Sequence, residues 1–252
     1  MCNLYSELKG QAAIRAAARA MHDRTGNLPP MPAIFPDMMA PVVRKAADGE
    51  RELLMLRWGL PTPPSELRGI DRGVTNVRNA GSPHWRAWTG IANKCVVPAT
   101  SFCEPSTHPD PRTGKKVWHW FAFNEERPLF FFAGLWCTWR GVRGSQKNPV
   151  QGEHELFGFL TTEANADVFA VHEKAMPAIL TTSEEIDLWM NAPINEALKL
   201  QRPLPDGAVR IVRSGMQEDQ WTCEADGQDI CDAFPTRERS LARMRGQPIR
   251  KW

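Results

Sequence analysis

Residues 128–136 read PLFFFAGLW, a short, strongly aromatic run that begins with proline. Short runs of aromatic and β-branched side chains, bounded by proline, glycine or polar turns, are typical of β-strands. Five more stretches share this character: RELLMLRW (51–58), KCVVPATSF (94–102), KVWHWFAF (116–123), ELFGFLTT (155–162) and AVRIVR (208–213). Because they do not alternate regularly with helices, the sequence predicts a mixed, predominantly antiparallel α+β fold.

Few helices are expected. The alanine-rich segment SELKGQAAIRAAARAMHDR predicts a surface helix from about residue 6 to residue 23, with Ser6 as its N-cap. The proline-rich segment at 25–41 predicts an extended loop. Thr182 and Glu185 have the spacing of a capping box, so a further helix is predicted to begin near residue 183.

The chain length fits one large β-rich domain, which we place at 2–220, followed by a basic C-terminal tail at 221–252. The tail ends in RERSLARMRGQPIRKW, and we favour a solvated, partly flexible segment over an arm that contacts phosphate. A net charge of +2 does not by itself indicate a nucleic-acid binder. Ten tryptophans against one tyrosine leave room for exposed rings that stack on bases.

The cysteine pattern bears on metals and on the compartment. No two cysteines form a CxxC pair and none clusters with histidine as in a zinc site, so we expect no metal and no cofactor. Residues 1–20 lack the apolar run of a signal peptide, and no stretch approaches the ~18 apolar residues of a membrane-spanning helix. We therefore expect an intracellular protein with reduced thiols and no membrane partner. The cysteines are Cys2, Cys95, Cys103, Cys137, Cys223 and Cys231.

The opening MCNLYS contains a chemically unusual position. If Met1 is removed, Cys2 becomes the terminus and offers an α-amine and a thiol on one residue. Cysteine is small enough to permit removal of the preceding methionine, and an α-amine with an ordinary pKa of about 7.7–8.0 is partly neutral near pH 7. Taken alone, however, a cysteine at position two is more often simply part of a frayed terminus.

Three other stretches place polar side chains in suggestive contexts. In VTNVRNA, Asn76 and Arg78 would project from one face of a strand, where the amide can orient a substrate oxygen and the guanidinium can hold a phosphate. In VPATSFCEP, apolar neighbours could raise the pKa of Glu104 toward neutrality. His172 follows a short helix that Thr162 is predicted to cap, and could shuttle protons. Each also has a structural interpretation: a surface loop, a solvent-facing glutamate, and a histidine satisfied by backbone carbonyls.

Together and in this order, these stretches resemble the SOS response-associated peptidase (SRAP) family over roughly residues 2–215. The resemblance implies a single mixed, barrel-like sheet with a few flanking helices. The matched pieces are Met1-Cys2, Arg57-Trp58-Gly59-Leu60, Asn76-x-Arg78, Pro98 to Glu104, Phe132-Ala133-Gly134-Leu135-Trp136, Thr161-Thr162-Glu163-Ala164-Asn165, and His172 followed by Met176-Pro177-x-Ile179-Leu180.

The resemblance implies a DNA-damage function with lyase-type chemistry. Similar proteins bind abasic sites in single-stranded DNA covalently through the terminal cysteine. The α-amine of Cys2 would form an imine with the C1′ aldehyde, and its thiol would close a thiazolidine that shields the lesion. Asn76 would position the sugar or the cysteine backbone, and Glu104 would relay protons. His172 would assist opening of the sugar ring or reversal of the crosslink.

The same resemblance implies DNA-binding residues and a setting. Arg57 and Arg78 would hold phosphates, Lys174 would replace a family arginine, and Trp58 would stack on a flanking base. The word peptidase refers to removal of the initiator methionine, in which Glu104 and Asn76 could take part with Cys2 as the nucleophile, although a general aminopeptidase could also do it. We expect a monomer in the bacterial cytoplasm, associated with the nucleoid when bound to DNA.

The chain departs from the family pattern at three places. Asn3 and Leu4 stand where glycine and arginine are common, Pro105 replaces an aromatic residue, and one extra residue separates His172 from the Met-Pro pair. Two rival interpretations stay open. One is a peptidase or amidohydrolase that uses the Cys2 thiol against an acyl carbon. The other is a non-catalytic single-stranded DNA-binding module that tolerates Cys2→Ala.

Overall fold

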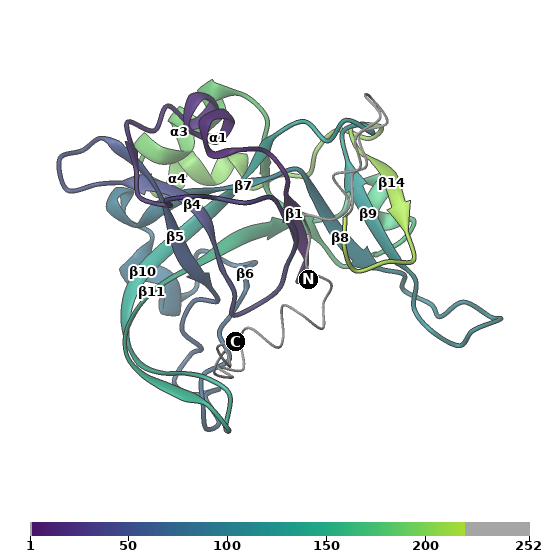
Figure 1. The fold of residues 1–252 in the computed structure, drawn as a ribbon, viewed down its shortest axis with the longest axis horizontal. Helices are drawn as coiled ribbons and strands as arrows, with labels where there is room; N and C mark the ends of the chain where they lie inside the picture. Colours follow the sequence, from purple (N-terminus) through teal and green to yellow (C-terminus); the bar gives the residue numbers. More distant parts are fainter. Residues whose placement is uncertain (1, 220–252) are drawn as a thin grey trace, which may run out of the picture. The chain divides into compact units, whose positions relative to one another are not determined.

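A closed barrel forms the centre of residues 2–219, the part of the chain that the computed structural model describes (Figure 1). It belongs to the larger of two sheets. The pairing of β11 with β10 is antiparallel, whereas the contact of β11 with the end of β5 is parallel and closes the barrel. The barrel strands are β4 (Met39–Lys45), β5 (Arg51–Trp58), β7 (Lys94–Ala99), β10 (Phe130–Gly144) and β11 (Pro149–Thr162). Short strands extend it: β2 (His22–Asp23), β6 (Asn76–Val77), β12 (Met176–Pro177) and β13 (Ile179–Leu180).

The second sheet lies beside the barrel and is antiparallel throughout (Figure 1). Its order is β14, β9, β8, β1, β3, so the first strand of the chain lies between two others. The prediction of a mixed, predominantly antiparallel, barrel-like α+β fold is confirmed. The strands are β1 (Tyr5–Glu7), β3 (Met31–Ile34), β8 (Ser101–Pro105), β9 (Trp118–Ala122) and β14 (Arg210–Ser214).

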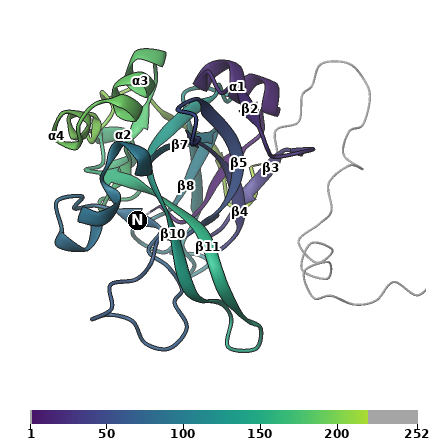
Figure 2. The ribbon, with the colours of Figure 1, turned by 90° about the vertical axis from the view of Figure 1, so that its left-hand side faces the viewer.

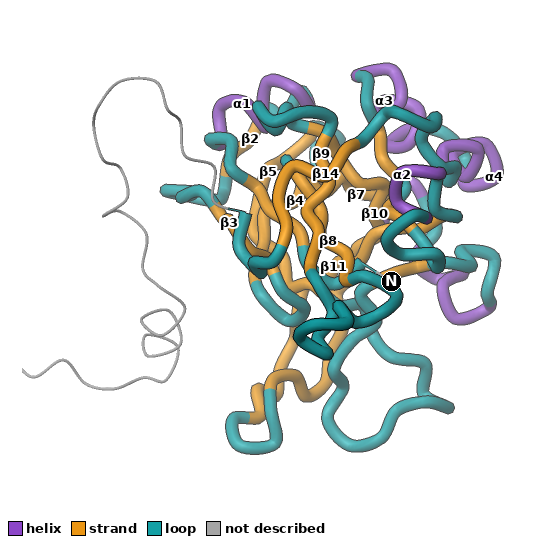
Figure 3. The backbone as a smooth tube through the Cα atoms, turned by 90° about the vertical axis from the view of Figure 1, so that its right-hand side faces the viewer, coloured by secondary structure: helices purple, strands orange, loops and turns teal. Residues whose placement is uncertain are grey.

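Helices α1 and α3 cover one end of the barrel, and the β10–β11 hairpin extends from the other (Figure 2). Figure 3 shows that the helices occupy only the rim of a molecule built mainly from strands. Within residues 2–219, no helix has the length and apolar character needed to cross a membrane. The α-helices are α1 (Gln11–Ala18), α2 (Ala166–Phe169), α3 (Ser183–Asn191) and α4 (Ile194–Ala197), and the 3₁₀ helices are η1 (Pro83–Trp88), η2 (Ile91–Asn93) and η3 (Leu198–Leu200).

The N-terminal predictions need correction. The helix expected from residue 6 to 23 is confined to Gln11–Ala18, and its N-cap is Gly10. Ser6 is instead a buried residue of β1, because strand pairing on both sides outweighs local helix propensity. The loop expected at 25–41 contains β3 and the start of β4.

The other predictions agree more closely with the structure. Strand β5 has the predicted bounds. Strand β10 runs past its predicted end at residue 136, and β11 begins before its predicted start at residue 155, so the two form a long hairpin. Helix α3 begins at Ser183, where the hydroxyl of Thr182 accepts a hydrogen bond from the N–H of Glu185 at 3.2 Å. The cap of α2, however, is Asn165 rather than Thr162. The C-terminal tail predicted at 221–252 lies outside the described residues.

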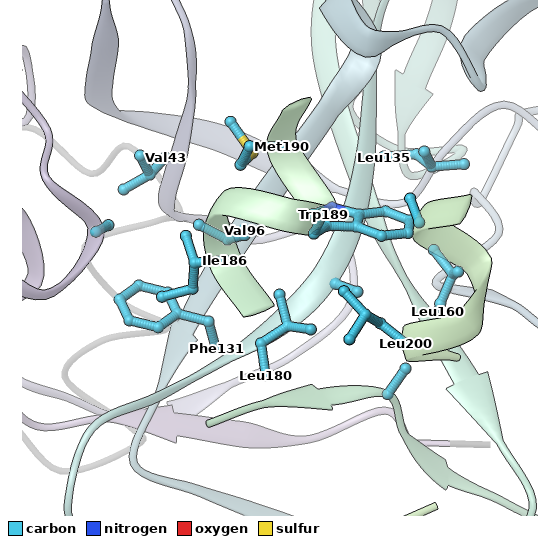
Figure 4. Packing of buried hydrophobic residues seen from close by; sticks show 14 of the residues in the cluster. Val43, Val96, Phe131, Leu135, Leu160, Leu180, Ile186, Trp189, Met190 and Leu200 are labelled. Carbon is cyan, nitrogen blue, oxygen red and sulfur yellow. The ribbon is translucent and has the colours of Figure 1, made fainter. Parts of the chain in front are cut away.

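One hydrophobic cluster fixes α3 to the outside of the barrel (Figure 4). Trp189 lies among Ile186, Phe131, Leu180 and other apolar side chains. Its indole N–H donates to the carbonyl of Cys95 at 2.8 Å, so the ring is both packed and hydrogen-bonded. A second cluster fills the barrel and includes Cys2, and the two clusters make the barrel a rigid support for the N-terminus.

A buried ionic network anchors the end of the described chain to the second sheet. Asp219 has no exposed surface and accepts two hydrogen bonds from Arg127, at 2.7 and 2.8 Å. The same carboxylate accepts from the hydroxyls of Ser6 on β1 and Ser101 on β8. One carboxylate therefore links the two strands that lead to Cys2 and Glu104.

Replacing Arg127 by alanine should lower the free energy of unfolding by about 3–5 kcal/mol, because Asp219 would be left buried without its cation. Urea denaturation of purified protein measures the change.

The matched control is Arg210→Ala, whose arginine lies 3.8 Å from Glu125 with both side chains more than half exposed. This variant should lose at most about 1 kcal/mol. Equal losses in the two variants would show that the Asp219 network does not stabilise the fold.

Candidate active site

Cys2 is held by hydrogen bonds to its backbone. The nitrogen of Cys2 donates to Oδ1 of Asn76 at 3.1 Å, and Nδ2 of Asn76 donates to the carbonyl oxygen of Cys2 at 2.7 Å. Both residues are buried, and the Cys2 thiol is directed to the carbonyl oxygen of Leu4 at 3.5 Å. In the unprocessed chain the Cys2 nitrogen is a peptide N–H, and after loss of Met1 it is the α-amine. Asn76 thus holds the backbone on both sides of the Cα atom of Cys2.

The position of Asn76 depends on the barrel. Strand β6 pairs in parallel with β11, and the loop before it is closed by a bridge between Leu60 and Val74. The buried guanidinium of Arg143 donates to the carbonyl oxygen of Gly59, the residue before Leu60 of this bridge. Residues far apart in the sequence therefore converge to place one amide against the N-terminus.

Glu104 is a buried carboxyl beside the N-terminal segment. The N–H of Cys103 donates to the carbonyl oxygen of Leu4 at 2.9 Å, so the pairing of β8 with β1 reaches the first residues of the chain. Glu104 has no exposed surface, and neither of its oxygens has a hydrogen-bond partner within residues 2–219. Burial raises the pKa of Glu104 to about 7. This carboxyl can therefore hold or release a proton near neutral pH.

His172 completes the group. Its Nε2 lies 3.6 Å from Oε2 of Glu104, and its Nδ1 lies 3.3 Å from the carbonyl oxygen of Pro105. Because a carbonyl only accepts, Nδ1 carries the proton and Nε2 of the neutral ring faces the carboxyl. Burial lowers the pKa of His172, which favours this neutral form. The structure therefore brings all four predicted catalytic residues, Cys2, Asn76, Glu104 and His172, to one place.

The environment also determines the state of the thiol. Burial raises the pKa of Cys2 well above its usual value, and the neighbouring Glu104 raises it further. The thiol is thus protonated at neutral pH and needs a base before it can attack. Glu104, whose pKa lies near neutrality, and the neutral imidazole of His172 beside it are candidate bases.

The predicted DNA-binding cations lie in different settings. Arg78 is half exposed and lies 4.0 Å from Glu163, while Lys174 is exposed two residues after His172. Arg57 is mostly covered and forms an ion pair with Asp37 at 3.0 Å. Arg78 and Lys174 can reach a phosphate directly. Arg57 is already paired with Asp37, so a phosphate would have to compete with this carboxylate for the guanidinium.

The stacking role predicted for Trp58 is wrong in this structure. Trp58 is fully buried inside the barrel, where its ring lies 5.2 Å from that of Phe159 and 5.1 Å from that of Tyr5. Its indole N–H donates to the carbonyl of Thr75 at 3.0 Å. The ring supports the residue before Asn76 and has no face for a base.

Sequence reasoning missed two supporting residues. The hydroxyl of Thr75 donates to Oδ1 of Asn3 at 2.7 Å and accepts from Nδ2 of Asn76 at 2.8 Å. It therefore connects Asn76 to the residue that follows Cys2. Its position next to Asn76 was the only available signal. Asp219 gave none, because its partners are distant in the sequence.

Comparisons with known proteins identify a family for the chain. A family model described as "SOS response associated peptidase (SRAP)" matches residues 1–214. No curated protein matches the chain.

Several solved structures share the fold. A protein from Bordetella bronchiseptica is 25% identical, with a TM-score of 0.63 over 85% of this chain and 98% of that one. A protein from Bacteroides thetaiotaomicron is 21% identical, with a TM-score of 0.61 over 84% and 90% of the two chains. A phage-related protein from B. bronchiseptica is 20% identical, with a TM-score of 0.57 over 82% and 92%.

The raised pKa of Glu104 predicts a pH-dependent effect of Glu104→Gln on stability. As the pH rises from 4.5 through 7, the unfolded chain loses the Glu104 proton before the folded chain does. The wild type therefore loses stability relative to the variant, by up to about 3 kcal/mol. Urea unfolding of both proteins at acidic and mildly alkaline pH measures the difference.

Glu66→Gln, at an exposed position, is the control and should show no such pH-dependent difference. If Glu104→Gln behaved like Glu66→Gln at every pH, the carboxyl of Glu104 would have an ordinary pKa and could not act as described.

Proposed function

Because the chain belongs to the SOS response associated peptidase (SRAP) family, we propose that it attaches itself covalently to abasic sites in single-stranded DNA through Cys2. The observation that carries this proposal is the grip of Asn76 on the backbone of Cys2, next to a buried carboxyl that titrates near neutrality. A terminal amine and thiol on one fixed residue suit an aldehyde, which is the reactive form of an abasic sugar.

The first step forms an imine. The neutral α-amine of Cys2 adds to C1′ of the ring-opened sugar, while Oδ1 of Asn76 accepts a hydrogen bond from the nitrogen and orients its lone pair. Glu104, protonated below its pKa of about 7, gives a proton to the departing hydroxyl. One water leaves, the product is a protonated imine, and Glu104 remains as the carboxylate.

The second step closes the ring. The carboxylate of Glu104 takes the proton of the Cys2 thiol as sulfur adds to the carbon of the protonated imine. Glu104 is thereby protonated again, and the ring nitrogen keeps the proton that it carried in the imine. The high pKa of the buried thiol is the reason a base is needed. His172, neutral and 3.6 Å from Glu104, can exchange protons with the carboxyl between steps. The product is a thiazolidine that shields the lesion.

Removal of Met1 has to come first, because the α-amine does not exist until the Met1–Cys2 bond is cleaved. Hydrolysis adds one water across that bond and releases methionine. The word peptidase in the family name supports a self-directed cleavage, with Asn76 accepting a hydrogen bond from the nitrogen of the scissile bond and Glu104 as acid and base. Bound DNA would be held outside the site by Arg78 and Lys174, which are open to phosphate.

Mixing wild-type protein with an oligonucleotide that carries one abasic site should give an adduct that survives a denaturing gel. Cys2→Ala should give no stable adduct yet bind the oligonucleotide with similar affinity, because it removes the thiol and leaves the cations. Cys103→Ala, which removes another buried thiol beside Glu104, is the matched control and should still form the adduct.

Two outcomes would favour the rival interpretations. Binding without any adduct in the wild type would indicate a non-catalytic DNA-binding module. Cys2-dependent turnover of a peptide or amide without an adduct would indicate a peptidase or amidohydrolase.

Glu104→Gln should slow adduct formation at least ~10²-fold, within the range for loss of a general acid and base. Its affinity for the same DNA should change much less, because Glu104 is buried away from the phosphates. Single-turnover gel kinetics and fluorescence anisotropy give the two quantities. Equal losses in rate and affinity would rule out the proton-transfer role of Glu104.

A further inference from the structure

One aromatic ring is exposed next to the candidate active site. Among residues 2–219, every phenylalanine, tyrosine and tryptophan is buried or half-buried except Phe169, whose exposed fraction is 54%. Phe169 is the last residue of α2 and contributes to neither the barrel core nor the cluster around α3. An isolated exposed ring needs no explanation by itself. Phe169 differs from such a ring because it lies three residues before His172 of the candidate active site.

Helix α2 is tied to the catalytic group through its neighbours in the sequence. Val168 packs in the same apolar cluster as Cys2, and its carbonyl accepts from the N–H of His172 at 2.7 Å. The carbonyl of Val171 accepts from the backbone N–H of Thr107 at 2.7 Å. Phe169 thus lies within one helical turn of the imidazole that faces Glu104.

The backbone of this segment is fixed although the ring is exposed. The side chain of Asn165 accepts from the N–H of Val168 at 3.1 Å and caps the helix, and its amide donates to the carbonyl of Pro205. Asp206 accepts from the N–H of Ala166 at 2.8 Å. A ring on such a support cannot easily fold back onto the protein, so its face stays available to a ligand.

Both signs of charge lie around α2. Asp167 on the helix and Asp206, which accepts from the N–H of Ala166, are acidic, whereas two cations lie near His172. Lys174 and Lys116 are both exposed, and both lie close enough to His172 to add to the lowering of its pKa that burial causes. Aromatic rings and cations near one site are the combination that binds single strands, because bases stack on the ring while phosphates meet the cations. A protein partner would not need the cations, and a membrane would need more than one apolar side chain.

We propose that Phe169 is a stacking site for an unpaired base next to the abasic nucleotide. The inference rests on the proposed function for the identity of the strand, and it gives Phe169 the role that buried Trp58 cannot fill. Stacking on one base contributes enough to change affinity by roughly 5- to 150-fold on removal of the ring. Phe169 contacts a neighbouring base rather than the reacting sugar, so it should affect binding and not the chemical step.

The test uses fluorescence anisotropy with an intact single-stranded oligonucleotide, which measures binding without the covalent step. Phe169→Ala should weaken binding at least ~5-fold and leave the dependence on salt unchanged, because no phosphate contact is lost. Phe169→Trp should bind as tightly as the wild type. Lys174→Ala should instead reduce the salt slope by about 0.7, as expected for one phosphate contact on a single strand.

Met21→Ala is the matched control, since Met21 is 64% exposed but lies beside β2, away from the site. It should bind like the wild type. If Phe169→Ala also bound like the wild type, the stacking site would be refuted even with normal adduct formation. If Phe169→Ala weakened binding while the wild type formed no adduct, the stacking site would stand and the covalent function would fall.

Discussion

Two hydrogen bonds between the side chain of Asn76 and the backbone of Cys2 are the constraint on which the site depends. A chain terminus is ordinarily among the least ordered parts of a protein. Here one side-chain amide accepts a hydrogen bond from the nitrogen of Cys2 and donates one to its carbonyl oxygen. Rotation about the N–Cα and Cα–C bonds of Cys2 is therefore restricted. The barrel holds Asn76, and the pairing of β1 with β8 holds the strand that follows Cys2. The barrel and the second sheet together therefore fix the position of Cys2.

Burial gives the site its chemistry. Removing Glu104 from water keeps its proton until near neutral pH, and the same environment keeps the Cys2 thiol protonated and the His172 ring neutral. All three groups are then uncharged, which lowers the cost of burying them together. The arrangement suits a reaction that first donates and then accepts a proton at one carboxyl.

Local sequence patterns predicted most of this fold where local and tertiary preferences agree. Strand β5 was predicted with its observed bounds because its side chains favour a strand and its pairing confirms it. The helix predicted from residue 6 begins later, because Tyr5–Glu7 pairs with neighbouring strands as β1. Trp58 shows a deeper limit: the sequence reveals an aromatic ring but not the barrel face to which it points. Phe169 drew no attention for the same reason, since exposure is a property of the assembled chain.

The central claim is that nitrogen and sulfur of a processed Cys2 join one sugar carbon, and intact-mass analysis of the purified adduct tests it most directly. The account predicts a mass equal to the chain without Met1 plus the abasic oligonucleotide, less one water, with the added mass on the N-terminal peptide after digestion. An adduct that retained Met1, or whose added mass lay on a lysine elsewhere in the chain, would contradict it.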